Sequence, residues 1–390
     1  MFEADRALLE RAGHGITVYE RHNDEIKSYR AWRRVDLLRR TIWATDTTAA
    51  LRRMLACERI DVAHFYNVFP LISPSAYYAC AAFGVPVVQT VQNYRHSCPA
   101  ALLHRNGRIC EDCVGKAIPW PGVWHGCYRQ SRVETAAVAA MLAAHRLAGT
   151  WQMRVHTYVA LTNFSRRKLI EGGLPAHKIV VKPNFLYPDP GPRAGDSSYV
   201  LFAGRLATEK GVATLLGAWQ SLHSIPLKVA GDGPLMPLVE EAARKRRPGG
   251  IEPLGWRFRK ETLELMENAS FLIVPSESYE TFGRVVMEAF ACGVPVVASR
   301  LGSLSELIQD GHSGLLFEPA NVEELAGAVR RLWDDKLLRE RLGKGARSEF
   351  ESRYTAERNY RMTMEIYENA ITGAASVNTS GTIKGSRRRA

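Results

Sequence analysis

The C-terminal half of the chain alternates short apolar runs with helical patterns, and this alternation restricts it to few folds. Its first run, YVLFAG, precedes GVATLLGAWQSL, which has the periodicity of a helix. The same alternation continues through PLKVAG, FLIVP and PVVAS. Strands this rich in Val, Ile and Leu are typical of a parallel sheet that is covered by helices on both faces. We therefore predict an α/β, Rossmann-like domain over residues 199–350.

The N-terminal half shows the same alternation less regularly. A long helix is expected after Ser131, because Ser131 and Glu134 have the spacing of a capping box. The β-rich runs of this half are residues 15–20, 61–67, 86–92, 158–163 and 179–184. The predicted organisation is a Rossmann-like domain over 1–184, a Pro/Gly-rich linker over 185–198, the domain over 199–350, a helix over 351–372 and a disordered tail over 373–390.

The first element of the chain is unexpected for this architecture. Residues 1–13 have the pattern of a charged amphipathic helix, whereas a Rossmann-like domain normally opens with a strand and a glycine-rich turn. The first strand is thus expected to be missing. Two explanations stay open: translation starts upstream of Met1, which we favour, or the unit has been lost.

Charge and hydropathy narrow the class of partner. The formal net charge of +12 favours an anionic partner, and residues 30–59 carry eight arginines against three acids. That segment is either a helix that lies on anionic lipid or an ordinary solvated helix. The apolar runs of the chain as a whole are too short to span a membrane. We therefore expect a cytoplasmic protein that can make peripheral contact with the inner membrane face. We expect no nucleic-acid partner, because no recognition module is present.

The loops that follow the C-terminal strands carry the candidate chemistry. Arg205 and Lys210 follow the first strand, and together they suit a diphosphate, although two exposed basic residues would look the same. Glu280 and Glu288 bracket a Phe282-Gly283 turn before a helix, and carboxylates suit hydroxyl groups rather than phosphate. A ligand with a diphosphate between polyols is a nucleotide sugar. Two glutamates with nothing to bind remain the alternative.

These residues also carry a resemblance to a known family. The segments FAGRLATEKGVATLLGAW, VAGDGPL and PSESYETFGRVVMEAFACGVPVVAS resemble retaining GT-B glycosyltransferases of the group 1, or family four, type, which have an E-x7-E motif. The resemblance extends over about residues 2–372. It implies two Rossmann-like domains with parallel sheets that face a central cleft.

The resemblance also implies roles for individual residues. Glu280 would contact the donor sugar, Glu288 would hold the ribose hydroxyls, and Arg205 and Lys210 would neutralise the diphosphate. Backbone groups near Phe282 and Gly283 would assist. The remaining donor-binding positions are the loop glycines Gly204, Gly231 and Gly233. Trp256 and Arg257 follow the run IEPLG at residues 251–255. Trp256 either contacts the base of the donor nucleotide or packs against the protein. No metal is expected in catalysis, because cations already lie where negative charge develops on the leaving group.

The N-terminal half resembles a subgroup of the family, with three departures. His64 is kept, but Tyr66 replaces a second histidine, and Gln92 replaces the histidine expected near the donor sugar. Gln92 can donate a hydrogen bond but cannot shuttle a proton. We place His64, Gln92 and Asn93 on the acceptor and sugar side, and expect His96 to face elsewhere. The third departure is the missing first strand.

Four of the seven cysteines cluster in an insertion over residues 96–130. Cys98, Cys110, Cys113 and Cys127 have the spacing C-x11-C-x2-C-x13-C, and four thiolates can complete a structural zinc site. An iron-sulfur cluster and unmetallated cysteines are the alternatives. The subgroup resemblance includes these cysteines.

The sequence thus favours a retaining glycosyltransferase that moves a sugar from a UDP- or GDP-linked donor to a glycan or lipid-linked acceptor, in surface polysaccharide or glycoconjugate synthesis. The alternative is a nucleotide-sugar-binding protein with lost or impaired turnover, which Gln92 and Tyr66 motivate. Such a protein would bind the donor without consuming it.

Overall fold

The computed structural model describes residues 1–22, 24–25, 39–193, 198–245 and 250–386, and the side chains as far as Ala374. The chain divides into two compact units. One unit contains residues 104–110 and 183–359, and the other contains residues 2–103, 111–182 and 360–390. We call them the C-terminal unit and the N-terminal unit.

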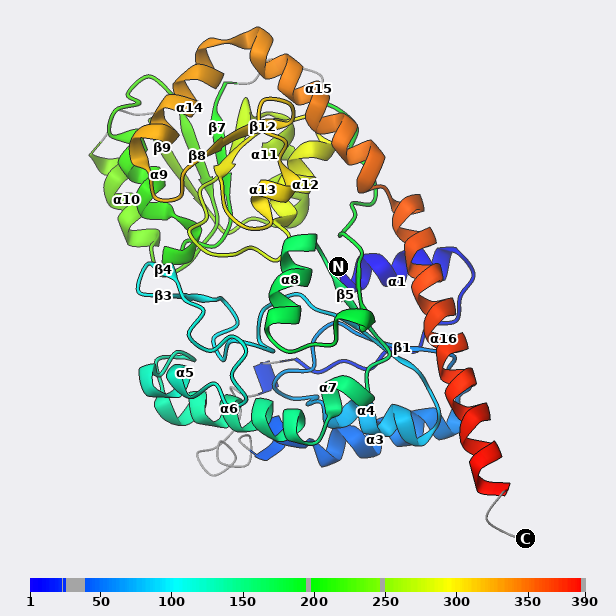
Figure 1. The fold of residues 1–390 in the computed structure, drawn as a ribbon. Coiled ribbons are helices and arrows are strands. Elements are labelled where there is room, and N and C mark those ends of the chain that lie inside the picture. Colours follow the sequence, from blue (N-terminus) through cyan, green and yellow to red (C-terminus); the bar gives the residue numbers. More distant parts are fainter. Residues whose placement is uncertain (23, 26–38, 194–197, 246–249, 387–390) are drawn as a thin grey trace. The chain divides into compact units, whose positions relative to one another are not determined.

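The C-terminal unit is built on a six-stranded parallel sheet (Figure 1). Its strands are β7 (Val200–Ala203), β8 (Leu227–Ala230), β9 (Ile251–Gly255), β10 (Phe271–Val274), β11 (Val296–Ser299) and β12 (Gly314–Phe317). Their order in the sheet is β12-β11-β10-β7-β8-β9. This is the doubly wound Rossmann order, in which the direction of winding reverses between the first strand, β7, and the fourth, β10.

Helices cover both faces of this sheet. They are α9 (Val212–Trp219), α10 (Met236–Arg244), α11 (Arg259–Glu267), α12 (Arg284–Ala291), α13 (Leu304–Leu307), α14 (Val322–Asp334) and α15 (Lys336–Arg353). A large core cluster lies on one face, where Phe202 and Val229 of the sheet pack with Trp219 of α9 and Val329 of α14. Asn321 caps α14 by accepting a hydrogen bond from the Glu324 amide, as its position predicts.

The N-terminal unit contains a four-stranded parallel sheet in the order β1-β2-β5-β6. The strands are β1 (Ala63–Phe65), β2 (Val87–Thr90), β5 (Thr157–Ala160) and β6 (Ile179–Val181). The helices are α1 (Phe2–Arg11), α3 (Thr45–Cys57), α4 (Ser75–Ala82), α5 (Trp120–His125), α6 (Arg132–Leu147), α7 (Thr150–Met153), α8 (Asn163–Glu171) and α16 (Ala356–Ser386).

Two different groups of helices cover this second sheet. Val87 and Tyr158 pack with Met141 of α6 on one face. On the other face Val88 packs with Leu9 of α1 and Tyr367 of α16. The C-terminal helix therefore returns to the N-terminal sheet and completes its core.

Some sequence predictions differ from the structure. The sequence predicts a strand over residues 15–20, but within the described ranges this run forms no strand, and Tyr19 donates a hydrogen bond to Thr47. The helix expected over 351–372 is interrupted near Tyr354, between α15 and α16, and α16 continues to Ser386. The basic segment 30–59 lies partly outside the described residues, and its described part includes α3.

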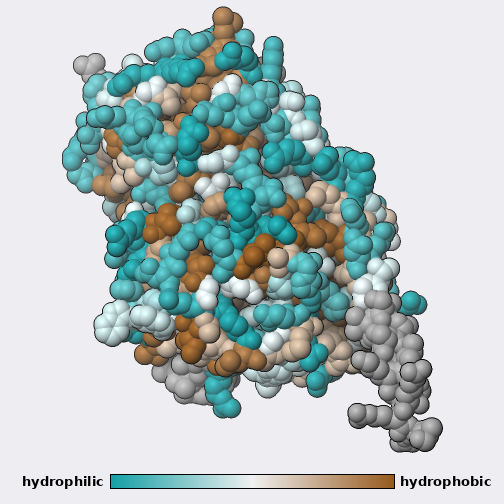
Figure 2. Space-filling view, viewed as in Figure 1, coloured by the Kyte–Doolittle hydropathy of each residue, from teal (hydrophilic) through white to brown (hydrophobic). Residues whose placement is uncertain are grey.

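The surface carries polar and apolar residues side by side. Figure 2 shows hydrophobic residues in several separate patches on the viewed face, among more numerous hydrophilic ones. No helix within the described part of the chain is both long enough and apolar enough to cross a membrane.

Candidate functional site

The strand order brings two loops of the C-terminal unit together. β7 and β10 are neighbours in the sheet although α9, β8, α10, β9 and α11 separate them in the sequence. Ligands of doubly wound sheets bind beyond the carboxyl ends of the strands, where the strand order reverses. The loop after β7 carries Arg205 and Lys210, and the loop after β10 carries Glu280, Phe282 and Gly283.

An ion pair joins these two loops. Lys210 Nζ lies 2.5 Å from Glu280 Oε1, and the Ser276 hydroxyl donates a second hydrogen bond to the same oxygen over 2.8 Å. The Glu280 side chain is mostly buried, with 16% of its surface exposed. Because the Lys210 ammonium has three donors, it can keep Glu280 and still donate to an incoming anion.

Glycines let the backbones of the loops approach closely. A Cβ on Gly211, directly after Lys210, would overlap the Pro275 carbonyl oxygen at the end of β10. A Cβ on Gly231 would overlap the Gly204 carbonyl oxygen, and one on Gly233 would lie 2.5 Å from the Leu206 carbonyl oxygen. Gly231 and Gly233 also have φ values of 151° and 156°. The predicted glycine positions thus shape one edge of the sheet with backbone alone.

Phe282 and Gly283 form the start of α12. Gly283 is the N-cap residue and has φ 85°, a conformation that favours glycine. The Phe282 side chain is buried and packs edge-on against Tyr354, with ring centroids 5.7 Å apart. Phe282 therefore contributes packing, while the helix N-terminus after it offers amide donors.

Glu288 lies inside α12 and is buried. Its Oε1 is 3.4 Å from Arg284 Nη2 and 3.5 Å from Arg259 Nε, and the carboxylate side chain is 7% exposed. Arg284 lies one turn earlier on the same helix, and Arg259 is the first residue of α11. Two guanidinium groups therefore lie beside this carboxylate and fix the position of Oε1.

Arg205 has a different environment. Its side chain is 63% exposed, and its nearest carboxylate, Glu209, lies 3.9 Å away. Trp256 and Arg257, after β9, are also exposed, and the Trp256 ring packs edge-on against Phe258. These three residues present cationic and aromatic groups to solvent on the C-terminal unit.

Sequence reasoning missed one histidine of this unit. His104 begins the hairpin of β3 (His104–Arg105) and β4 (Arg108–Ile109), which belongs to the C-terminal unit. Burial lowers the pKa of His104, and the carboxylates of Glu209 and Glu277 oppose this shift. Within the described residues its buried Nε2 has no hydrogen-bond partner. The hairpin could have been found from Asn106-Gly107, the strongest short signal for a two-residue turn.

The structure places His64 of the N-terminal unit in an internal network. Its Nδ1 lies 2.7 Å from the Tyr367 hydroxyl, and its Nε2 lies 2.7 Å from Thr90 Oγ1. Tyr66 stacks on the imidazole at 4.4 Å between ring centroids. Burial, with a smaller effect from Lys182, lowers the pKa of His64 to about 3, so its ring is neutral near pH 7.

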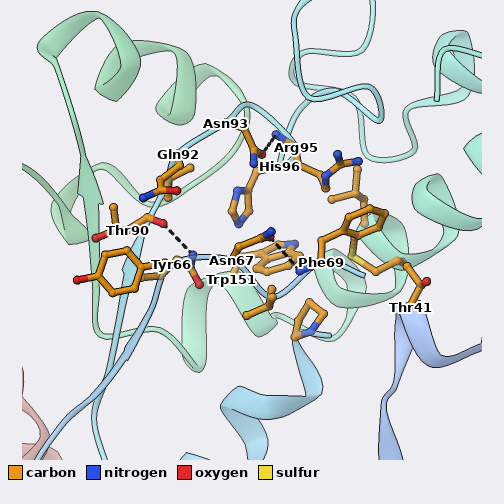
Figure 3. Close-up of a pocket in the computed structure, with 16 residues that line it drawn as sticks. Thr41, Tyr66, Asn67, Phe69, Thr90, Gln92, Asn93, Arg95, His96 and Trp151 are labelled. Carbon is orange, nitrogen blue, oxygen red and sulfur yellow. Dashed lines mark hydrogen bonds between the residues drawn. The ribbon is translucent and has the colours of Figure 1, made fainter. Parts of the chain in front are cut away.

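Gln92 and Asn93 line a pocket of the N-terminal unit (Figure 3). Contrary to expectation, His96 lines the same pocket, and its imidazole points into it beside Trp151. Burial, followed by the positive charges of Arg146 and Arg95, lowers the pKa of His96 to about 4. The pocket thus joins two predicted residues to a neutral histidine.

The predicted zinc site finds no support in the structure. None of the seven cysteines, all of which lie in the described part of the chain, forms a disulfide. Over the described ranges, no group of three or more His, Cys, Asp or Glu side chains is placed to hold a metal ion. Cys113 Sγ instead accepts a hydrogen bond from the Gly122 amide over 3.2 Å. The zinc site at these four cysteines therefore stays a prediction.

Comparison with known proteins finds a family match in the C-terminal half of the chain. Residues 187–349 match the sequence model of the family "Glycosyl transferases group 1". An uncharacterised glycosyltransferase of Methanocaldococcus jannaschii is 36% identical over 174 residues, which are 45% of this chain and 49% of that protein. The glycogen synthase of Mycobacterium tuberculosis is 33% identical over 187 residues, 47% of this chain and 45% of the synthase. The chain therefore spans about half the length of these curated relatives.

Solved structures match more of the chain. Anabaena Alr3699/HepE in complex with UDP has a TM-score of 0.62 and 18% identity, and the match covers 82% of this chain and 80% of that one. Sucrose-phosphate synthase from Thermosynechococcus elongatus has a TM-score of 0.63 and 18% identity, covering 85% and 78%. The chain has the GT-B fold of glycosyltransferases, and its residues 187–349 match the group 1 family of these enzymes.

Proposed function

We propose that this protein is a retaining glycosyltransferase that transfers a sugar from a nucleotide-diphosphate-sugar donor to a glycan or lipid-linked acceptor. The observation that carries the proposal is the Lys210–Glu280 pair at the point where the strand order reverses. A cation and a carboxylate held together there suit a diphosphate beside a sugar. The structural neighbour HepE has been solved with UDP and with UDP-glucose.

The donor would lie along the loops of the C-terminal unit. Lys210 and the exposed Arg205 would contact the diphosphate, and Glu280 would accept hydrogen bonds from the sugar hydroxyls. Amide groups at the N-terminus of α12 would add donors to the phosphate oxygens. Glu288, whose Oε1 is held by two arginines, would accept the ribose hydroxyls through Oε2.

Catalysis would come mainly from stabilising the leaving group. Cleavage of the sugar–phosphate bond leaves an oxocarbenium-like sugar and increases the negative charge on the diphosphate. Preorganised cations at that charge lower the barrier, which is the role we assign to Lys210 and Arg205. The leaving phosphate oxygen would assist deprotonation of the acceptor on the same face of the sugar, so the anomeric configuration would be retained.

The test is turnover with a matched variant. The full chain is incubated with UDP- and GDP-linked sugars and a mixture of glycan and lipid-linked acceptors, and release of the nucleoside diphosphate is followed. We expect release by the native chain and little by Lys210→Ala. Lys245→Ala is the control, because that exposed lysine pairs with Glu241 on α10, away from the proposed site. Donor binding without release under every acceptor condition would instead favour a binding protein with lost turnover.

A further inference from the structure

The pocket of the N-terminal unit contains a mostly buried cation that has no carboxylate partner among the described residues. The Arg95 guanidinium lines the pocket, and its Nη1 donates to the Pro99 carbonyl oxygen over 2.6 Å. Its guanidinium carbon lies 4.0 Å from the centroid of the Phe69 ring and 5.2 Å from that of Tyr128. Burial lowers the pKa of Arg95, and no Asp or Glu is among its contacts in the described residues. A buried cation is costly unless it is paired, so the pocket is prepared for an anion.

Two amide side chains of the pocket can donate to a ligand. Asn67 Oδ1 accepts a hydrogen bond from the Phe69 backbone amide, and Asn93 Oδ1 accepts one from the Arg95 backbone amide, each over 3.0 Å. The amide oxygens are thereby occupied, which leaves the NH2 groups of both side chains as donors for a ligand.

His96 adds a group that has no internal partner. Its Nδ1 is buried, and within the described part of the chain it makes no hydrogen bond. Figure 3 shows the imidazole between Asn93 and Trp151, pointing into the pocket. A neutral imidazole can donate to an anion or accept from a hydroxyl, according to its tautomer. Among the described residues that line the pocket there is no Asp or Glu whose charge would repel an anion.

We propose that this pocket binds an anionic group of the acceptor, a phosphate or a carboxylate, through the Arg95 guanidinium with His96 and Asn93 as further donors. The proposal rests on the proposed function, because it names the chemical class of that enzyme's acceptor. Arginine suits both anions, since its planar fork donates two parallel hydrogen bonds. The apolar floor, which includes Trp151 and Met141, excludes water and strengthens such a pair.

Two pairs of small probes separate the sources of the anion. Methyl β-D-glucuronide and methyl β-D-glucoside differ in a carboxylate, as in an acidic glycan. Isopentenyl diphosphate and isopentenol differ in a diphosphate, as in a lipid-linked acceptor. Binding of each probe to the full chain is measured by saturation-transfer NMR. We expect the charged member of at least one pair to bind about tenfold or more tightly than its neutral partner. The responding pair identifies the source.

Variants connect this binding to Arg95. Arg95→Gln should weaken the charged probe about tenfold or more and leave the neutral one unchanged. Arg129→Gln is the matched control, because Arg129 lies 5.3 Å from the same Tyr128 ring, is half exposed and does not line the pocket. Arg95→Lys should restore part of the binding, since it keeps the charge. If Arg95→Gln does not fold, the proposal is tested by comparing the binding of charged and neutral probes to the native chain and to Arg95→Lys.

Three results would overturn the proposal: equal binding of charged and neutral probes, unchanged binding of the charged probe by Arg95→Gln, or no binding of any of the four probes to the native chain. A parallel titration with UDP keeps this test apart from the proposed function. If UDP binds neither the native chain nor any variant, the proposed donor site is wrong. If Arg95→Gln at the same time loses binding of the charged probe and not of the neutral one, the proposal for the pocket is still supported.

Discussion

Lys210 Nζ lies 2.5 Å from Glu280 Oε1, although the two residues are 70 positions apart in the sequence. The contact exists because β7 and β10, whose following loops carry them, are neighbours in the sheet. The pair therefore depends on the doubly wound topology. We expect both residues to contact a ligand that binds at that edge of the sheet.

Removing the ammonium of Lys210 should reduce turnover more than donor affinity. The charge on the diphosphate grows in the transition state, so a cation there stabilises the transition state more than the bound donor. We expect kcat of Lys210→Ala to fall about 100-fold or more, with a smaller rise in KM. Steady-state kinetics measure both, and Lys245→Ala should match the native chain. Equal losses in kcat and donor affinity would assign Lys210 to ground-state binding only.

Glu288 should recognise the ribose. Glu288→Gln should weaken binding of the donor nucleotide about tenfold, because charge-assisted hydrogen bonds from the hydroxyls become neutral ones. The same substitution should leave the affinity for a 2′,3′-dideoxynucleotide unchanged, since that ligand has no ribose hydroxyls. Calorimetric titrations of both proteins with both ligands give the comparison. An equal loss for the two ligands would show that Glu288 acts through Arg284 and Arg259 instead.

Gly231 should not accept a side chain. A Cβ there would overlap the Gly204 carbonyl oxygen, so Gly231→Ala should destabilise the C-terminal unit by more than about 1 kcal/mol. Gly327 is the control, because it lies within α14 and a Cβ there meets nothing within 4 Å. Gly327→Ala should stabilise the protein by up to about 1 kcal/mol. Chemical denaturation measures both, and equal effects of the two substitutions would contradict the account of the loop.

Buried neutral histidines should make the N-terminal unit sensitive to acid. The pKa values of His64 and His96 are lowered from 6.5 to about 3 and about 4. Below pH 6.5 the unfolded chain binds protons at these sites while the folded chain does not. The free energy of unfolding therefore decreases as the pH is lowered. Each histidine contributes a slope of at most about 1.4 kcal/mol per pH unit. The free energy of unfolding between pH 6.5 and 4 should therefore depend less on pH in His96→Gln. The exposed His177→Gln should keep the native slope.

Turnover should persist when metals are removed. Side-chain cations occupy the proposed diphosphate position, so the leaving group needs no divalent ion for charge neutralisation. Native enzyme treated with a chelator and assayed in its presence should keep most of its activity. A loss that added Mg²⁺ or Mn²⁺ reverses would show that a metal shares this role.

Many elements of the C-terminal unit could be predicted because strands such as β7, β10 and β11 are buried, largely apolar runs between polar loops. The contact of Lys210 with Glu280 could not, because it depends on the order of the strands in the sheet, which the alternation does not specify. Residues 15–20 alternate between apolar and polar side chains as a strand does. This pattern shows that the side chains would fit a pleated sheet, but it does not show that a partner strand is available.

The pocket shows a similar limit. The resemblance singled out Gln92 and Asn93, which line this pocket, whereas the position of His96 depends on the local path of the chain after β2. The hairpin that begins at His104 has strands of two residues each, which are too short for any periodicity to reveal.

The measurement that tests the central claim most directly is a calorimetric titration of the full chain with UDP and with GDP. The account predicts that one of the two nucleotides binds at a single site and that Glu288→Gln weakens this binding. If neither nucleotide binds the folded chain at millimolar concentration, the loops after β7 and β10 do not form a donor site.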